Sequence, residues 1–454
     1  MPQPTARRPT PSARRNARIF VAGLLVVVCA GALLLATPWT TRSGDATPPV
    51  DAVFTAVSAV SVTGLVTVET AEHWNFGGQV VILALIQIGG LGFMVGTSLV
   101  LRVLQRSQSS LRGALLLQDG SPTLSLREAV ELSGRIVRFT LVAEAMGTLF
   151  LALRFSRDMP AHDAIWQGTF HSISAFCNAG FDLRGGYESM IGYQTSLWVN
   201  AVLMTLIQLG ALSFIVLADV GKSWRWRRLA FETKLVLALH GALLAVAALL
   251  FLAMEWNQAL ESTPAWAKPM AALFQSVSAR TAGFATVGFD SVTGFTLFFY
   301  IGVMFIGGAS GSTAGGVKLA TAGVVFAAIQ SAFRGQMEPH LFGRRVGAPV
   351  IMRALSVIVV MFAAHFVVSI GLMVVEDITH HSTSPIALMF EAMSALATVG
   401  LSTGVTPDLA VASKLILCGA MLFGRLGPLT VVYALQRRQR IVNYRFPAAQ
   451  VNFG

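Results

Sequence analysis

The chain has 454 residues, 54% of them hydrophobic and only 12% charged, with a formal net charge of +11. A soluble globular protein carries about 25% charged residues, so this composition excludes an ordinary soluble domain and indicates a multi-pass protein embedded in membrane lipid. The basic residues cluster between long apolar segments, which indicates membrane topology and argues against nucleic acid as a partner.

No pattern of reactive or metal-binding side chains accompanies this composition. Cys29, Cys177 and Cys418 lie far apart in or beside apolar stretches, and the eight histidines form no HExxH or similar pairing. The sequence also offers no paired intramembrane aspartates and no credible Ser/His dyad. We therefore expect no enzyme activity and no bound cofactor.

The chain begins with a basic segment, residues 1–17, which we expect to be a disordered tail. An apolar run follows from about residue 19 to 39, and the arginines before it also fit the start of a signal peptide. The run is closer to the length of a membrane span, and no small-residue cleavage site is clear. We interpret it as the first membrane helix.

One short motif occurs four times along the rest of the chain. It consists of a phenylalanine, a serine four residues later, and a glycine five or six residues after the serine, followed by Leu or Phe. The copies are Phe54–Leu65, Phe170–Phe181, Phe274–Phe284 and Phe390–Leu401. Because they lie about a hundred residues apart, we infer four repeats of one unit.

Each predicted unit places its motif between two apolar runs. The first runs cover about 19–39, 136–154, 234–254 and 354–375, and the second runs cover about 79–101, 197–218, 296–331 and 412–435. The segment that ends in the motif is only about a dozen residues long, too short to cross a bilayer. A proline precedes it in every unit, and proline favours the first turn of a helix, so we expect a re-entrant pore helix.

These patterns predict an all-α integral membrane protein with eight transmembrane helices in four pseudo-fourfold helix–pore loop–helix repeats around one central pore. The expected repeats are residues 18–105, 134–222, 232–335 and 351–437, with cytoplasmic linkers at 106–133 and 336–350 and a C-terminal tail at 438–454. Basic residues precede the first unit and follow every unit, so the positive-inside rule puts both termini in the cytoplasm. The motifs then face the exterior.

Backbone that is not helical at membrane depth is stable only where it is buried in protein or lines a watery path. Four glycine-bearing loops around one axis can direct carbonyl oxygens toward a dehydrated cation such as K⁺. The third unit contains a second filter-like sequence around Gly288, but the register of the repeat favours Gly283. The predicted ion-binding residues are Val62, Thr63, Gly64, Asn178, Ala179, Gly180, Thr281, Ala282, Gly283, Thr398, Val399 and Gly400.

The second apolar run of the third unit is rich in glycine, and each interior glycine costs a helix about 1 kcal/mol relative to alanine. We expect this run to break into two half-helices joined by a flexible gate below the filter; a nucleotide-binding P-loop is excluded because GK[ST] is missing. The predicted gate residues are Gly307, Gly308, Gly311, Ser312, Thr313, Gly315, Gly316 and Arg425.

Three charged residues lie within predicted spans, Arg425, Glu144 and Lys318. A central arginine costs roughly 2.5–3.5 kcal/mol on insertion scales, and we expect Lys318 to lie nearer the cytoplasmic end. Arg425 is interpreted either as a positive barrier beside the gate or as the structural partner of an acid such as Glu144. Glu144 itself is either that partner or a coupling site.

Together these motifs resemble the Ktr/Trk/HKT superfamily of potassium transporters. The resemblance covers about residue 18 to the end and rests on the four repeats, on Cys177–Phe181, Arg280–Phe284 and Gly308–Gly316, and on Arg425. Because the first span directly precedes the first motif, the chain is most similar to the Ktr-type membrane subunit.

The resemblance implies a homodimer in the cytoplasmic (inner) membrane, with one pore per subunit and a cytoplasmic ring of nucleotide-binding regulatory subunits. It implies K⁺ uptake that Na⁺ influences as a coupling or activating ion. A serine at the first filter position accompanies Na⁺ permeation in this family, so Gly64 predicts K⁺ selectivity. Two alternatives stay open: a secondary carrier for another cation or a small organic solute, and an intramembrane enzyme, which the missing motifs argue against.

Overall fold

The computed structural model describes residues 11–109, 126–335, 339–380 and 383–427. The expected C-terminal tail, residues 438–454, lies outside the described residues, as do parts of the N-terminal tail, of both linkers and of the fourth repeat. The fold is almost entirely helical; the described strands are β1 (His340–Leu341) and β2 (Arg344–Arg345), which form a small antiparallel hairpin.

The helices differ widely in length, from short re-entrant segments to rods longer than a membrane is thick. They are α1 (Pro11–Leu35), α2 (Pro49–Ser61), α3 (Thr70–His73), α4 (Phe76–Ser109), α6 (Leu126–Phe155), α7 (Ala161–Cys177), α8 (Leu197–Ala211), α9 (Phe214–Lys222), α10 (Phe231–Glu255), α11 (Lys268–Ser278), α12 (Gly294–Phe305), α13 (Leu319–Phe333), α14 (Ala348–Ile378), α15 (Pro385–Leu396) and α16 (Val411–Leu426).

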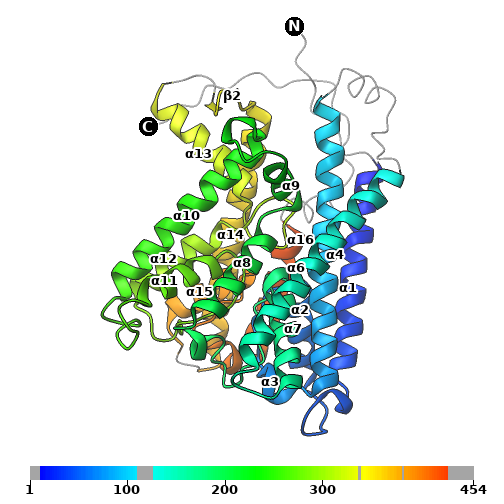
Figure 1. Ribbon diagram of the computed structural model, residues 1–454, viewed down its shortest axis with the longest axis vertical. Helices are drawn as coiled ribbons and strands as arrows, with labels where there is room; N and C mark the ends of the chain where they lie inside the picture. The colour runs from blue at the N-terminus through cyan, green and yellow to red at the C-terminus, as the bar shows by residue number, and fades with distance from the viewer. Residues whose placement is uncertain (1–10, 110–125, 336–338, 381–382, 428–454) are drawn as a thin grey trace.

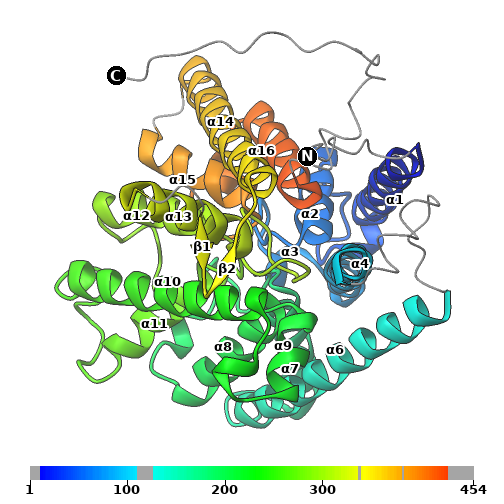
Figure 2. The same ribbon diagram turned by 90° about the horizontal axis from the view of Figure 1, so that it is seen from above.

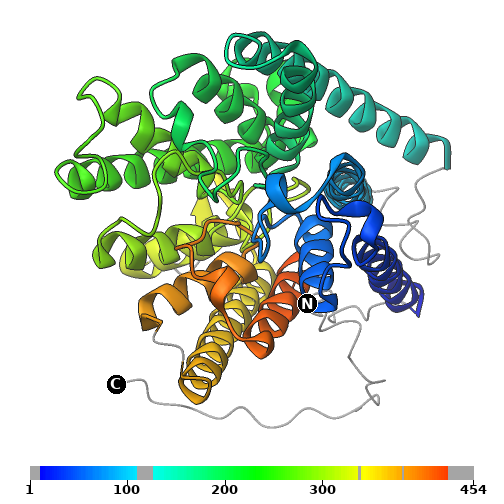
Figure 3. The same ribbon diagram turned by 90° about the horizontal axis from the view of Figure 1, so that it is seen from below.

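The helices surround a common centre in chain order (Figures 2 and 3). The long helices run roughly along the long axis of the molecule, with α3 at one end and the β hairpin at the other (Figure 1). Helix α4 contacts α7, α8 contacts α11, α12 contacts α15, and α16 contacts α2. The last of these contacts joins the end of the described chain to its beginning, so the bundle is closed.

Four short helices, α2, α7, α11 and α15, lie inside this bundle and begin where the prolines predict. Pro49 and Pro385 are the first residues of α2 and α15, Pro269 is the second residue of α11, and Pro160 is the N-cap of α7. Their fixed φ suits the first turn, and their missing N–H is not needed there. Each helix then carries its motif serine and phenylalanine into the buried core.

The outer helices have the inverse arrangement, with large apolar side chains such as Leu33, Leu249 and Phe362 exposed. Among the described residues, four helices are long and apolar enough to cross a membrane, or five if the bent pair α8–α9 is one span. Shorter apolar helices accompany them, at Val21–Leu35, Pro49–Ser61, Gly294–Phe305, Leu319–Phe333 and Pro385–Leu396. Apolar surface on this scale is stable in contact with lipid and unstable in water.

Three elements test where the sequence places helix ends. The apolar run 296–331 is divided as expected, into α12 and α13. Helix α1 begins at Pro11, inside the segment expected to be disordered, because alanine and arginine there are strong helix formers behind a proline at the first position. The run 197–218, expected to be one helix, is broken: α8 and α9 meet at an angle of 101°.

Candidate ion-binding site

In each of the four pore loops the motif glycine and the residue two positions before it both have left-handed backbone. The preceding residues are Val62 and Asn178, which cap α2 and α7, and Thr281 and Thr398, which follow the ends of α11 and α15; their φ is 49° to 68°. The glycines are Gly64, Gly180, Gly283 and Gly400, with φ from 74° to 93°. Side chains rarely tolerate this region, so its recurrence at eight matching positions is a constraint that the four loops share.

The four glycines form a closed ring. Each glycine lies against the residue that directly precedes the glycine of the next loop. A Cβ atom added to Gly64 would lie 2.3 Å from the carbonyl oxygen of Ala179, and one on Gly180 would lie 2.9 Å from that of Ala282. A Cβ atom on Gly283 would approach Val399 O at 2.9 Å, and one on Gly400 would approach Thr63 O at 1.9 Å, which closes the circle. Only glycine allows the four loops to meet this closely.

The structure therefore brings together eight of the twelve predicted residues, the four glycines and the residue before each, and the other four directly precede these pairs in the chain. It also answers the register question in the third unit, because Gly283 belongs to the ring and Gly288 does not. The atoms nearest a Cβ on Gly288 belong to Asp290 and Ile191, outside the ring. In the same stretch, the side chain of Gln275 donates a hydrogen bond to Val287 O at 2.5 Å. The filter-like sequence around Gly288 therefore packs against the pore helix and is not part of the ring.

The motif serines, which the sequence singled out without a role, hold the loops in place. Ser58 Oγ accepts from Gly64 N at 3.1 Å, and Ser394 Oγ accepts from Gly400 N at 3.0 Å. Ser174 Oγ donates to Phe181 O at 2.7 Å, and Ser278 Oγ donates to Phe284 O. The narrow range of the spacing between serine and glycine, five or six residues, was the available signal, because a hydroxyl within the last turns of the pore helix reaches only a loop of restricted length.

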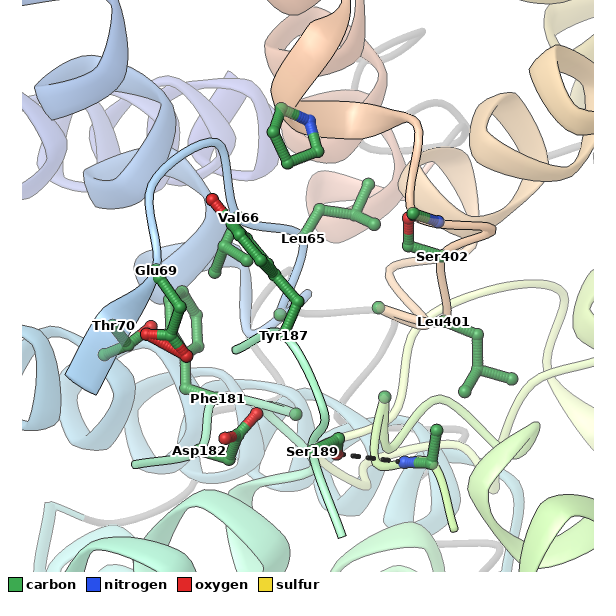
Figure 4. A pocket seen from close by; sticks show the side chains of 17 residues that line it. Leu65, Val66, Glu69, Thr70, Phe181, Asp182, Tyr187, Ser189, Leu401 and Ser402 are labelled. Atoms are coloured by element: carbon green, nitrogen blue, oxygen red, sulfur yellow. Dashed lines mark hydrogen bonds between the residues drawn. The ribbon is translucent and has the colours of Figure 1, made fainter. Parts of the chain in front are cut away.

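A cavity of about 110 Å³ opens on one side of the glycine ring and is lined by all four glycines. Figure 4 shows the side chains around it: Glu69 and Asp182 lie on one side, Leu401 and Ser402 lie across from them, and Tyr187 reaches over the cavity between them. Ser189 is oriented by a hydrogen bond from Ala285 N at 3.1 Å. A space of this size holds a few water molecules or a partly hydrated monovalent ion.

The two carboxyl groups at this cavity ionise less readily than exposed acids. Burial raises the pKa of Glu69 to about 7, and the nearby charge of Asp182 adds to the shift, although the amides of Ala71 and Glu72 oppose it. Burial likewise raises the pKa of Asp182 to about 6, against the hydrogen bond from Arg184 N. Both groups therefore change charge within the physiological pH range.

On the opposite side of the ring lies the segment between α12 and α13, residues 306–318, here called the gate loop. It runs inward and returns on itself, with Gly307 N donating to Val317 O at 2.9 Å and Val317 N donating to Phe305 O at 3.1 Å. Gly311 and Gly316 have positive φ, which lets the chain reverse. A Cβ on Gly315 would lie 2.6 Å from Ala397 O, so the loop touches the base of the fourth pore loop.

The gate loop replaces a contact that the other three units make. In α4, α8 and α16 the corresponding glycines, Gly89, Gly210 and Gly424, pack so tightly on a pore helix that a Cβ would lie about 2 Å from a carbonyl of its last turn, at distances of 2.1, 1.9 and 1.9 Å. In the third unit Gly307 instead packs on Gly315 O of its own loop, at 1.9 Å. In the third unit the gate loop therefore occupies the place where the other units have a direct contact between the second helix and the pore helix.

Arg425 binds the gate loop and does not pair with Glu144. Its guanidinium, 1% exposed, donates to the carbonyls of Thr313 and Gly89 and lies over the ring of Phe93 at 4.4 Å. The Glu144 carboxyl accepts a hydrogen bond from the Gln87 amide at 3.1 Å. Of the two interpretations offered by the sequence for Arg425, the carboxylate pair is absent from the described residues.

The family described as TrkH, cation transport protein, matches residues 10–441. The potassium/sodium uptake protein NtpJ of Enterococcus hirae is 35% identical over 96% of this chain and 97% of that protein. The Ktr system potassium uptake protein B is 38% identical in Vibrio alginolyticus, over 92% of this chain and 91% of that protein. Its Bacillus subtilis counterpart is 34% identical over 96% of both chains.

Among solved structures, the crystal structure of the potassium transporter TrkH from Vibrio parahaemolyticus superimposes with a TM-score of 0.69. The match covers 95% of this chain and 87% of that chain at 22% sequence identity. Because the identity is low, this likeness shows the fold alone, which is mostly helical with several apolar helices.

Proposed function

The chain belongs to the TrkH family of cation transport proteins, which are ion transporters and not enzymes, and from this premise we propose that it carries K⁺ into the cell across the cytoplasmic membrane. The observation that carries the proposal is the closed ring of Gly64, Gly180, Gly283 and Gly400, each placed against a carbonyl of the next loop. Close, non-helical backbone in the middle of a membrane protein suits a path for a dehydrated cation.

The ion-binding filter consists of the twelve loop residues around this ring, with K⁺ held by their carbonyl oxygens. No carboxylate belongs to the twelve, which favours selection by carbonyls over a ring of charged side chains. The carboxyl groups of Glu69 and Asp182 line the cavity on the outer side, where they raise the local concentration of cations. Relatives named as potassium uptake proteins support K⁺ as the substrate, and NtpJ adds Na⁺.

The gate loop closes the path on the cytoplasmic side of the filter. Its Gly315 touches the fourth pore loop, and Arg425 binds its Thr313, so the loop lies directly under the filter and has a buried anchor. Movement of this loop opens the path. The glycines with positive φ provide the freedom for that movement.

The complete topology follows from the same repeat. We infer eight crossings in pseudo-fourfold arrangement. The broken pairs α8–α9 and α12–α13 and the helices α1 and α16 count as crossings together with α4, α6, α10 and α14. The basic residues that follow α9 and those of the β hairpin then face the cytoplasm, and α3 faces outward (Figure 1). A homodimer and a cytoplasmic nucleotide-binding ring complete the assembly, consistent with relatives that are named as parts of a Ktr system.

Uptake without coupling is thermodynamically sufficient at moderate external K⁺, because a membrane potential supplies about 2.3 kcal/mol per charge per 100 mV, roughly fiftyfold accumulation. Na⁺ then acts as an activating ion, and uptake from traces of K⁺ requires it as a coupling ion. A carrier for an organic solute is disfavoured, since a cavity of about 110 Å³ is smaller than the usual ligand site of about 300 Å³ or more.

The experiment that tests this function is Rb⁺ and K⁺ flux into proteoliposomes that contain the chain and the regulatory ring, with and without Na⁺. We expect K⁺ flux that Na⁺ increases. If no K⁺ flux is measured into liposomes that contain both components, the proposal is overturned. Flux of an organic solute would favour the alternative of a secondary carrier.

A further inference from the structure

The bend between α8 and α9 separates several backbone carbonyls from their helical partners, among them those of Gly210 and Ala211. In a continuous helix Gly210 O would accept from Phe214 N, and Ala211 O from Ile215 N, because each carbonyl bonds the amide four residues on. The angle of 101° between the two helices removes both bonds. Buried carbonyls need partners, so something else must satisfy them.

Those partners come from the gate loop. Thr313 N donates to Gly210 O at 3.2 Å, and Ala309 N donates to Ala211 O at 3.0 Å. The break in the second unit and the loop in the third therefore satisfy each other's backbone hydrogen bonds. Helix α8 supplies the carbonyl acceptors, and the loop supplies amide donors that are not part of a helix.

The bend is itself held by local contacts. Leu212 N donates to Gln208 O at 3.0 Å and ends α8, and Ser213 Oγ accepts from Val216 N at 3.5 Å and caps α9. A small apolar cluster then joins α9 to the gate loop, separate from the main core. Its members include Val216 of α9, Ala309 and Ile306 of the gate loop, Leu319 of α13, and Leu212.

The same loop residue connects all four units. The backbone N–H of Thr313 donates to Gly210 O of the second unit, and its backbone C=O accepts from Arg425 of the fourth. Arg425 also donates to Gly89 O of the first unit. One hydrogen-bonded chain thus crosses the centre of the bundle beneath the glycine ring. Arg425 anchors one side of the gate loop, and the α8–α9 bend anchors the other.

We propose that the carbonyls of Gly210 and Ala211, freed by the bend at Leu212–Ser213, bind the gate loop and hold it closed. The gate loop is released when α9 straightens and continues α8 as one helix. The inference rests on the proposed transport function and adds the second unit to the gate. The physical basis is competition: the carbonyls bond the amides of Ala309 and Thr313 while α9 is bent, and the amides of α9 itself when the helix is continuous.

Ser213 allows the two states to be shifted in opposite directions by substitutions at one position. Ser213→Ala removes the cap and introduces the best helix former, so it favours a continuous helix. Ser213→Pro also removes the cap, but proline fixes φ near −65° and disrupts a continuous helix. Ser213 already has φ −61°, and Leu212 has the extended backbone that a residue before proline requires (φ −87°, ψ 124°), so the bent state accommodates proline.

The test is Rb⁺ flux into proteoliposomes, measured with and without the activated regulatory ring. We expect Ser213→Ala to raise flux without activation about fivefold at unchanged K⁺/Na⁺ selectivity, and Ser213→Pro to lower activated flux about fivefold. Ser196→Ala is the matched control: Ser196 caps α8 through Val199 N, also at 3.5 Å, and lies away from the gate loop. It should leave both fluxes unchanged.

Equal changes in the two Ser213 variants would overturn the proposal, since a merely structural role of the cap affects both in the same direction. Flux that is unchanged in both would overturn it as well, with folding checked by size-exclusion chromatography in detergent. If a Ser213 variant does not fold, Leu212→Ala provides a second way to favour the continuous helix, with raised basal flux expected. If the unsubstituted protein shows no Rb⁺ flux, the transport function itself is refuted, and the same experiment reveals this outcome.

Discussion

Gly400 of the fourth pore loop lies against Thr63 of the first, so close that a Cβ atom on Gly400 would come within 1.9 Å of the Thr63 carbonyl oxygen. This contact joins the last repeat to the first and closes the ring. A methyl group there would displace the Thr63 carbonyl, and Gly400 also has a φ of 90° that alanine resists. Gly400→Ala should therefore lower Rb⁺ flux at least tenfold in proteoliposomes.

The matched control for that substitution is Gly404→Ala. Gly404 has a similar φ of 84°, but nothing lies within 4 Å of its would-be Cβ. It carries the same backbone penalty without the contact, so we expect flux close to that of the unsubstituted protein. Equal losses in the two variants would assign the effect to loop strain and remove the ring as its explanation.

Gly64 should set the choice between K⁺ and Na⁺. A side chain at this position enters the ring beside Ala179 O, 2.3 Å from a Cβ, and changes the spacing of the carbonyls that replace the hydration shell. We expect Gly64→Ser to raise Na⁺ flux relative to K⁺ flux several-fold, measured as competition of the two ions with Rb⁺. A conducting Gly64→Ser protein with unaltered selectivity would contradict the assignment of the filter.

Repetition made the ring predictable from the sequence. A glycine at one position carries little information, but a glycine five or six residues after a serine in four units restricts the loop length. The hydrogen bond from Gly64 N to Ser58 Oγ shows why the distance varies so little. The same register separated Gly283 from the more filter-like Gly288. Proline predicted the starts of the pore helices for a local reason, its preference for the first turn.

The bend between α8 and α9 was not predictable in the same way. The apolar run around Leu212 and Ser213 contains no proline, a single glycine such as Gly210 is tolerated within a helix, and hydropathy is continuous across the bend. The bend exists because its free carbonyls meet amides from residues a hundred positions later, at Ala309 and Thr313. Such a tertiary cause leaves only a weak local trace, here a serine that can cap α9.

External pH should modulate transport through Glu69 and Asp182. Because their pKa values are raised to about 7 and about 6, both are largely charged at about pH 8 and largely neutral at about pH 5.5. Protonation removes negative charge from the cavity outside the ring, so the local cation concentration falls. We expect Rb⁺ flux at low ionic strength to fall about threefold over this range.

Glu69→Gln separates the two groups. It should lower flux at about pH 8 and leave a smaller pH dependence centred on the pKa of Asp182, about 6. Glu188→Gln is the control, since Glu188 is an exposed carboxylate on the loop after Asp182 and does not line the cavity. A pH profile that Glu69→Gln leaves unaltered would assign the titration to another group.

Arg425 offers a test of how the gate loop is held. The guanidinium donates to two carbonyls at once, Thr313 O and Gly89 O, and an ammonium group keeps the charge but lacks the planar fork that reaches both. If the hydrogen bonds hold the loop, Arg425→Lys should raise basal Rb⁺ flux about tenfold, because one hydrogen bond to a charged group is worth about 1.5 kcal/mol. Arg425→Gln should raise it further.

A positive barrier would give a different order. In that case Arg425→Lys retains the charge and leaves flux unaltered, and only Arg425→Gln raises it. Arg353→Gln serves as the control for loss of an arginine, since Arg353 is exposed on α14. The structure favours the first outcome, because two backbone carbonyls from different units converge on a side chain that is 1% exposed, and a charge acting only through space would not need that geometry.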